Sequence, residues 1–158
     1  MSVLSFFTWC ENTWLGEAIR DSRWLFPVIE SIHLLGLAVI GGAVLMMNLR
    51  LLGFGLRRQP AAQLWRDTRP WLMGSLTVML VSGILLFTSE ATKLYYHEAF
   101  WVKMVSLLMA ALFTFTVVRR VALADPDRLR PLWSRAAAII SIFLWSTVGI
   151  CGRWIGFS

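Results

Sequence analysis

Residues 26–47 read FPVIESIHLLGLAVIGGAVLMM, a largely apolar run that is long enough to cross a bilayer. A transmembrane helix needs roughly 20 mostly apolar residues, and this run carries only Glu30 and His33 as ionisable groups. An ionisable side chain inside a bilayer helix is costly, so it marks a functional site by default. The stretch therefore predicts a membrane-spanning helix with a candidate site near its first turns.

Three more apolar runs follow along the 158 residues, and charged segments separate them. The chain is 58% hydrophobic and 15% charged, whereas a soluble domain has about 45–50% apolar and about 25% charged residues. This pattern predicts one integral membrane domain over 1–158, an all-α four-helix transmembrane bundle. The predicted spans are residues 24–49, 71–88, 99–118 and 136–154.

The segment before the first span, residues 3–19, is aromatic but only partly apolar. It is too short and too acidic to span, so we expect an amphipathic segment that lies in the headgroup zone. Asp21 and Ser22 are suited to cap the helix that follows. The start of the chain lacks the basic residues of a cleavable signal peptide.

Lysine and arginine are distributed unevenly between the segments that flank the spans. Residues 50–69 and 119–135 hold ten of them, and the opposite flanks hold four. The positive-inside rule places the two arginine-rich loops in the cytoplasm, so both termini face the periplasm of a bacterial inner membrane. The net charge of +6 is thus a topology signal. No basic, base-reading helix is present, and no nucleic-acid partner is expected.

The only two histidines, His33 and His97, both fall on the half of the bundle that faces outward. Two imidazoles from separate helices could hold one metal ion or one haem iron between them. Each residue also has a simpler explanation. His33 could hydrogen-bond a neighbouring helix, and His97 follows two tyrosines at the membrane boundary, where a histidine needs no special cause.

Four further residues belong to this candidate site. Glu30 shares a helix face with His33 and could accept a proton from one ring nitrogen, which would leave the other nitrogen as the ligand. Gly36, on the same face, leaves room for a flat ligand or a close helix. Lys103 and Arg153 could pair with haem propionates, although Lys103 could also snorkel and Arg153 could anchor its helix in the headgroups.

Other chemistry has weaker support in the sequence. The seven methionines are scattered, so core packing explains them better than copper binding. Cys10 and Cys151 both fall on the outer side; a periplasmic disulfide is conceivable, but two unpaired thiols are the preferred interpretation. No nucleotide-binding, hydrolase or metalloprotease motif occurs, and we assign no catalytic residue.

The stretch ESIHLLGLAVIGGAVLMMNLRLLG and the ending LWSTVGICGRWIGF resemble the first and last spans of small bacterial four-helix membrane proteins of unknown function. More distantly, His33, the SGILLF stretch and FWVKM with Lys103 resemble CopD-like copper-resistance proteins and HemJ-type protoporphyrinogen oxidases. The HemJ resemblance implies haem b bound through histidine. This chain departs from the WLHxK pattern of that family, because Trp101 stands two residues before Lys103, where the family has histidine.

These observations lead to two functional hypotheses. The first is a b-type cytochrome-like protein in which His33 and His97 hold one haem near the periplasmic face. It would carry electrons between a periplasmic redox partner and the quinone pool or a larger complex. The alternative is a cofactor-free accessory subunit of a larger membrane complex, whose small-residue helix faces make tight contacts. The residues on those faces are Gly36, Gly41, Gly42, Gly74, Gly83, Gly149 and Gly152.

Overall fold

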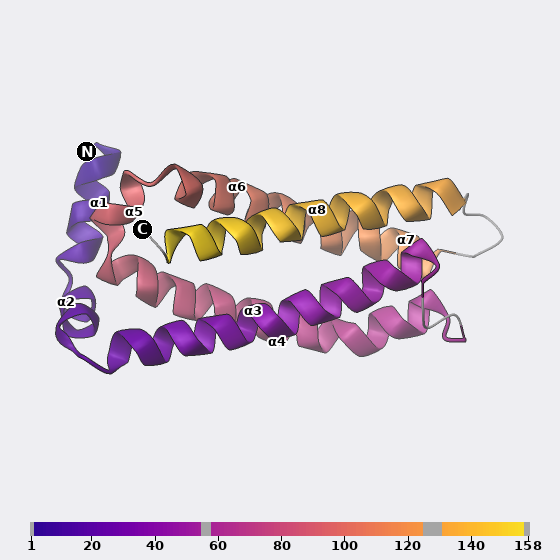
Figure 1. The fold of residues 1–158 in the computed structure, drawn as a ribbon, viewed down its shortest axis with the longest axis horizontal. Coiled ribbons are helices and arrows are strands. Elements are labelled where there is room, and N and C mark those ends of the chain that lie inside the picture. The colour runs from indigo at the N-terminus through magenta and orange to yellow at the C-terminus, as the bar shows by residue number, and fades with distance from the viewer. Residues whose placement is uncertain (1, 55–57, 125–130, 157–158) are drawn as a thin grey trace.

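The computed structural model describes residues 2–54, 58–124 and 131–156, and four of its helices are long and apolar enough to cross a membrane. These helices run side by side as an elongated bundle (Figure 1). The predicted all-α transmembrane bundle is confirmed, and the chain is a multi-pass membrane protein. The four helices are α3 (Leu25–Leu52), α4 (Ala61–Ser89), the segment Glu98–Leu123 and α8 (Pro131–Ile155).

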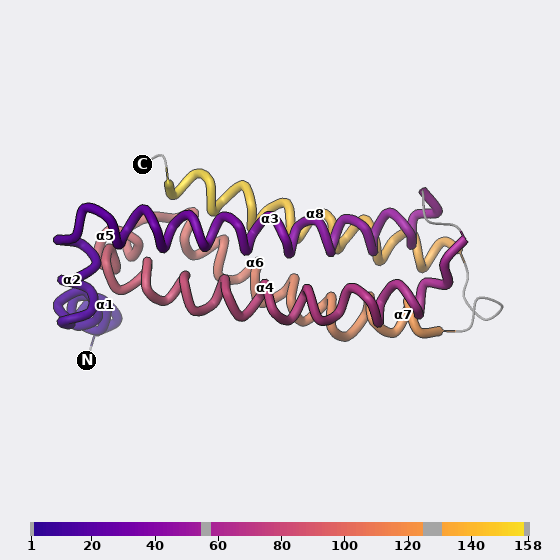
Figure 2. The backbone as a smooth tube through the Cα atoms, turned by 90° about the horizontal axis from the view of Figure 1, so that it is seen from below, coloured from indigo at the N-terminus to yellow at the C-terminus, as the bar shows by residue number. Residues whose placement is uncertain are grey.

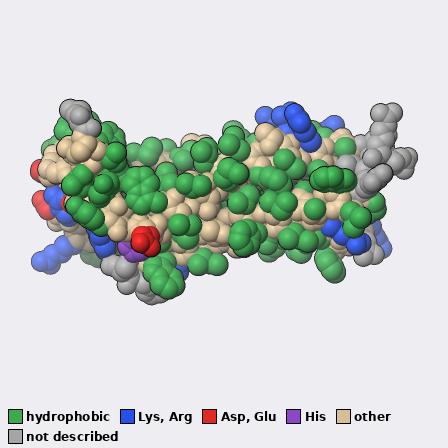
Figure 3. Space-filling view, turned by 90° about the horizontal axis from the view of Figure 1, so that it is seen from above, with side chains coloured by type: hydrophobic (Ala, Val, Ile, Leu, Met, Phe, Trp, Pro, Cys, Tyr) green, Lys and Arg blue, Asp and Glu red, His purple; other side chains and the backbone are tan. Residues whose placement is uncertain are grey.

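The bundle is held together by the packing of α3 on α4, of α3 on α8 and of α6 on α8 (Figure 2). Its core is apolar and tightly buried, as Ile40 and Val148 show with 1% exposure each. Large apolar side chains cover much of the outer flank, and lysines and arginines gather toward the two ends (Figure 3). An apolar flank between charged ends is what a bilayer requires of a membrane-embedded bundle.

The third long helix has three parts: α6 (Glu98–Phe113), the π-helical turn η1 (Thr114–Val118) and α7 (Arg119–Leu123). The π-turn lies against α8, where the buried Trp145 donates a hydrogen bond from Nε1 to Thr114 Oγ1 over 3.0 Å. The bond satisfies an indole N–H that would otherwise be unpaired inside the membrane.

Three short helices gather at one end of the bundle, which we call the capped end: α1 (Val3–Glu11), α2 (Trp14–Asp21) and α5 (Ala91–Tyr95). There α1 and α2 lie across the long helices (Figure 1). The Phe7 ring of α1 packs edge-on against the rings of Phe87 and Tyr95, 5.0 and 5.3 Å away. The N-terminal segment is therefore docked on the bundle through an aromatic cluster.

A close approach of α2 to α4 fixes this cap further. A Cβ atom at Gly16 would lie 2.5 Å from the Thr88 carbonyl oxygen and 2.7 Å from that of Glu11. Glu11 also accepts a hydrogen bond from the backbone N–H of Thr92 over 2.6 Å and forms an ion pair with Arg20 at 3.3 Å. Only glycine permits this contact between backbones.

The long helices extend beyond the predicted spans: α3 ends at Leu52, the third long helix ends at Leu123 and α8 begins at Pro131. Two further differences have a local cause. The segment 3–19 was expected as one amphipathic stretch, but it forms two helices because Thr13 caps α2, accepting a hydrogen bond from Gly16 N at 3.3 Å. The second span was expected to begin after Pro70, yet α4 begins at Ala61 and contains Pro70. A membrane helix tolerates an internal proline where neighbouring groups satisfy the freed backbone.

The end opposite the cap, which we call the arginine-rich end, holds the segments that were predicted to be cytoplasmic. Ser134 Oγ of α8 donates to the Leu51 carbonyl there over 2.8 Å and ties α8 to the last turn of α3. Arg57, Arg128 and Arg130, which contributed to the predicted orientation, lie outside the described residues. The described arginines at this end are Arg50, Arg58, Arg66, Arg69, Arg119, Arg120 and Arg135.

Candidate functional site

The half-buried His33 ring lies between α3 and α4, where its Nδ1 atom is 2.8 Å from Ser82 Oγ. The Ser82 hydroxyl proton is already used, because Ser82 Oγ donates to the Val78 carbonyl over 2.6 Å. With the hydroxyl proton on the Val78 carbonyl, Ser82 Oγ accepts from His33 Nδ1–H, and these two contacts favour that tautomer. In the neutral ring, Nε2 then keeps its lone pair.

This arrangement is the one that metal-binding histidines use, in which one ring N–H donates to a fixed acceptor and the other nitrogen serves as ligand. The sequence predicted that Glu30 would hold one ring nitrogen, whereas the side-chain contact on Nδ1 is with Ser82 Oγ. Glu30 reaches instead toward the end of α8, where its Oε1 atom is 3.9 Å from the position of a Cβ on Gly156. Ser82 itself is only 4% exposed.

Two glycines on the same helices shape the space around His33. A Cβ on Gly83 would lie 3.3 Å from His33 Cε1, so this glycine makes room for the ring. Gly36 was expected to admit a flat ligand or a close helix, and the structure shows the close helix. A Cβ there would lie 3.1 Å from Met79 Cγ and 3.3 Å from Val78 Cγ1 of α4.

Lys103 brings a cation into the same half of the bundle. It extends from α6 toward α8, where its Nζ atom is 3.4 Å from the position of a Cβ on Gly152. Its charge acts on His33 and on Cys151, so the three side chains are electrostatic neighbours. Within residues 2–54, 58–124 and 131–156, no carboxylate forms an ion pair with Lys103. An anionic ligand would supply the missing charge.

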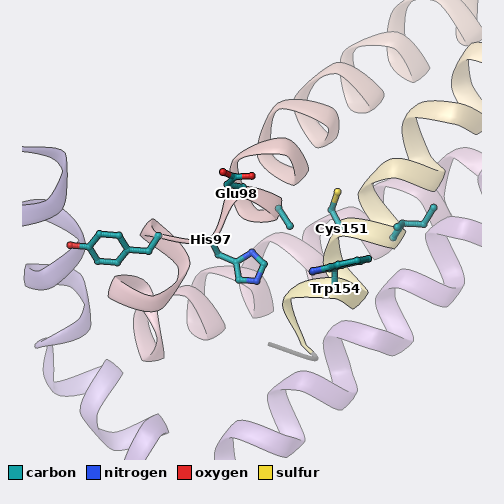
Figure 4. A pocket seen from close by; sticks show the side chains of 7 residues that line it. His97, Glu98, Cys151 and Trp154 are labelled. Carbon is teal, nitrogen blue, oxygen red and sulfur yellow. The ribbon is translucent and has the colours of Figure 1, made fainter.

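His97 precedes the first turn of α6 and borders a pocket of about 450 Å³ at the capped end. Its ring points toward Trp154 of α8, with Cys151 one turn back along that helix, while Glu98 points away (Figure 4). Such a volume is typical of small-molecule sites. The lining residues are Tyr96, His97, Glu98, Ala99, Ile150, Cys151 and Trp154.

The two histidines thus have different immediate surroundings, since His33 contacts α4 and is not among the residues that line the pocket of His97. Cys151 connects the two places, because it lines the pocket and neighbours Lys103, whose charge in turn acts on His33. Arg153, the other predicted propionate partner, is exposed on the last turn of α8. The pocket, Lys103 and His33 therefore all lie in the capped half of the bundle.

The donor set limits the kind of metal centre that fits. Among the described residues, no group of three or more His, Cys, Asp or Glu side chains could hold a metal ion. A haem iron needs only axial ligands from the protein, because the porphyrin supplies the other four. Cys10 and Cys151 are both free thiols, so the preferred interpretation of unpaired cysteines agrees with the structure. Cys10 is buried on α1 in the same cluster as Phe7.

Comparison with known protein families matches residues 6–158 to a family of unknown function, DUF6644. The chain belongs to the DUF6644 family. The match agrees with the resemblance of its first and last spans to small membrane proteins of unknown function. No curated protein and no solved structure matches the chain. The resemblance to CopD-like and HemJ-type proteins therefore remains an expectation from short motifs.

Sequence reasoning missed Ser82, the first residue of the SGILLF stretch of this DUF6644 protein, as a partner of His33. A serine within an apolar helix is an ambiguous signal, because its hydroxyl usually bonds to its own helix, as Ser75 Oγ does to the Trp71 carbonyl at 2.6 Å. The helpful signal was the glycine that follows Ser82, since a serine–glycine pair leaves space for a large polar side chain from a neighbouring helix.

Proposed function

We propose that this DUF6644 protein binds haem b in the capped half of its bundle. The haem would transfer single electrons between redox partners at the outer face of the membrane. The observation that supports the proposal best is the His33–Ser82 hydrogen bond, which presents Nε2 as a ligand nitrogen. Bound haem would supply a one-electron redox centre. The protein residues would bind it, orient it and neutralise its carboxylates.

The residues of the capped half fit such a group in chemistry. His33 offers a nitrogen lone pair, and His97 offers a second imidazole at the adjoining pocket. Two neutral imidazole ligands favour a low-spin iron that transfers electrons. Lys103 would pair with one haem propionate, because it is a cation without a carboxylate partner among the described residues. Arg153, at the same end of the bundle, would pair with the other propionate.

The partners follow from the orientation that the arginines favour. With the arginine-rich end in the cytoplasm of a bacterial inner membrane, the capped end faces the periplasm. The haem would then exchange electrons with a periplasmic redox protein on one side and with quinone or a larger membrane complex on the other.

The proposal is tested by the reduced-minus-oxidised absorption spectrum of the detergent-purified protein. We expect a Soret and an α-band, and His33→Ala should abolish both. His97→Ala serves as the matched comparison: if both histidines bind the iron, this variant keeps haem but converts it to a high-spin spectrum. Absence of any haem band from wild-type protein produced with adequate haem supply would contradict the proposal.

A second candidate function rests on four glycines that do not pack against other parts of the bundle. A Cβ added to Gly41, Gly42, Gly74 or Gly149 would meet nothing within 4 Å. Smooth faces of this kind suit a neighbouring membrane helix, as an accessory subunit of a larger complex would require. Stable co-purification with a complex whose activity survives replacement of both histidines would favour this function over haem binding.

A further inference from the structure

A shallow groove of about 490 Å³ lies at the arginine-rich end, far along the third long helix from His97. Its lining follows the helical repeat in two rows of residues spaced four apart. One row is Phe115, Arg119 and Leu123, and the other is Thr116, Arg120 and Ala124.

The groove faces away from the bundle. Val118 and Ala122, on the same helical segment, are 1% and 2% exposed and pack in the core. Phe115 forms part of the groove wall and is anchored from behind by an edge-on contact with Trp65, with ring centroids 6.2 Å apart. The groove is therefore a preformed feature of the surface, with a firm aromatic wall toward the apolar part of the helix.

Both arginines of the groove are exposed. Across the described ranges 2–54, 58–124 and 131–156, neither Arg119 nor Arg120 forms an ion pair or a side-chain hydrogen bond. Two adjacent guanidinium groups offer planar donors that match a phosphate. Arg119 and Arg120 directly follow Val118, the last residue of the apolar part of this helix.

From this combination we infer that the groove binds one anionic phospholipid, with its phosphate on Arg119 and Arg120 and an acyl chain along Phe115. Basic pockets beside transmembrane helices are suited to anionic headgroups. The apolar wall distinguishes a lipid from a soluble anion, because a free phosphate would gain nothing from Phe115. The inference does not depend on haem binding at the opposite end.

The chain supplies a matched control for nonspecific attraction of arginines to headgroups. Arg66 and Arg69 are also exposed at the arginine-rich end, on α4, but they do not line the groove. If general electrostatics were the only effect, the loss of either pair would weaken lipid binding to a similar extent.

The experiment is native mass spectrometry of the full-length protein in detergent, titrated with phosphatidylglycerol or with phosphatidylcholine of the same acyl chains. Wild type should retain one phosphatidylglycerol in preference to phosphatidylcholine. Each basic residue near a membrane surface contributes about 1 kcal/mol, so R119A/R120A should bind about 30-fold more weakly. R66A/R69A should bind as wild type does.

Two additional arms make the outcome decisive. Arg119→Lys with Arg120→Lys keeps both charges but loses the planar guanidinium donors, so it should bind more tightly than R119A/R120A and more weakly than wild type. Circular dichroism confirms that each variant keeps its helices. Excess inorganic phosphate should fail to displace the lipid. Equal losses in the two double-alanine variants, no preference for phosphatidylglycerol, or displacement by inorganic phosphate would each overturn the inference.

Discussion

The two halves of the bundle both bury polar side chains, but they use them differently. In the arginine-rich half, Asn48 Nδ2 donates to Ser141 Oγ at 3.0 Å, and both residues are 1% exposed. In the capped half, His33 uses one ring nitrogen on Ser82 and keeps the other. Lys103 adds a charge there without a carboxylate partner in the described part of the chain.

This difference separates a structural polar contact from a candidate site. A buried polar group inside a membrane protein usually finds a partner on a neighbouring helix, and such bonds average about 0.6 kcal/mol. The Asn48–Ser141 bond fits that role, although Asn48 Oδ1 has no partner among the described residues. In the capped half, His33 is an ionisable residue within a membrane helix, and Lys103 lacks a carboxylate partner among the described residues, which marks this half as the candidate site.

The largest contrast is expected between two serines. Ser82→Ala removes the acceptor that fixes the His33 tautomer, and loss of such a partner typically lowers metal affinity by about 10- to 100-fold. Ser141→Ala breaks the Asn48 contact and should leave haem affinity unchanged while lowering stability. Haem titration and thermal unfolding of both variants provide the measurement. Equal haem affinity in both variants would remove the distinction between the halves.

Lys103 should matter through the haem carboxylates. A hydrogen bond to a charged group contributes about 1.5–3 kcal/mol, so Lys103→Gln should weaken haem binding by at least about tenfold. Lys93→Gln is the matched control, because Lys93 is exposed at the capped end and pairs with Glu90 at 4.0 Å. Binding of haem dimethyl ester should not distinguish wild type from Lys103→Gln; an equal loss with the ester would argue against a propionate contact.

Filling the space beside His33 should have a smaller effect. An alanine at Gly83 would place its Cβ 3.3 Å from His33 Cε1, and mild overpacking of this kind costs about 1 kcal/mol, or about fivefold in affinity. Gly74→Ala on the same helix meets open space and should change nothing. Haem affinity measured side by side is the check, and a weaker Gly74→Ala protein would show that α4 responds to any added methyl group.

The smallest effect is expected in the arginine-rich half. Trp145→Phe removes the indole donor to Thr114 Oγ1 and should lower stability by about 0.6 kcal/mol. Its haem spectrum should equal that of wild type. Unfolding in mixed detergent measures the first quantity, and a changed spectrum would show that the two halves are coupled.

The sequence predicted the four spans because the bilayer demands long apolar runs, and these are visible in one dimension. It did not predict that α4 begins at Ala61, since residues 61–70 mix apolar with charged side chains and hydropathy does not mark a helix that continues beyond the apolar run. The break between α1 and α2 depends on the Thr13 cap, and the π-turn carries the Thr114 hydroxyl that accepts from Trp145 of α8. Neither contact is visible in the composition.

The candidate site shows the same division. His33 and Lys103 could be singled out because ionisable residues are rare in apolar helices. Their partners could not, because the contacts of His33 with Ser82 and of Lys103 with Gly152 depend on how the helices are placed side by side. Pairing of His33 with His97 on one iron remains a prediction, to be decided by the spectra of the two alanine variants.

The most direct test of the central claim is a haem titration of the purified, haem-free protein in detergent, followed at the Soret band. We predict saturation at one haem per chain for wild type and loss of saturable binding for His33→Ala. Identical titration curves for the two proteins would contradict the claim that His33 Nε2 is a ligand in this membrane bundle.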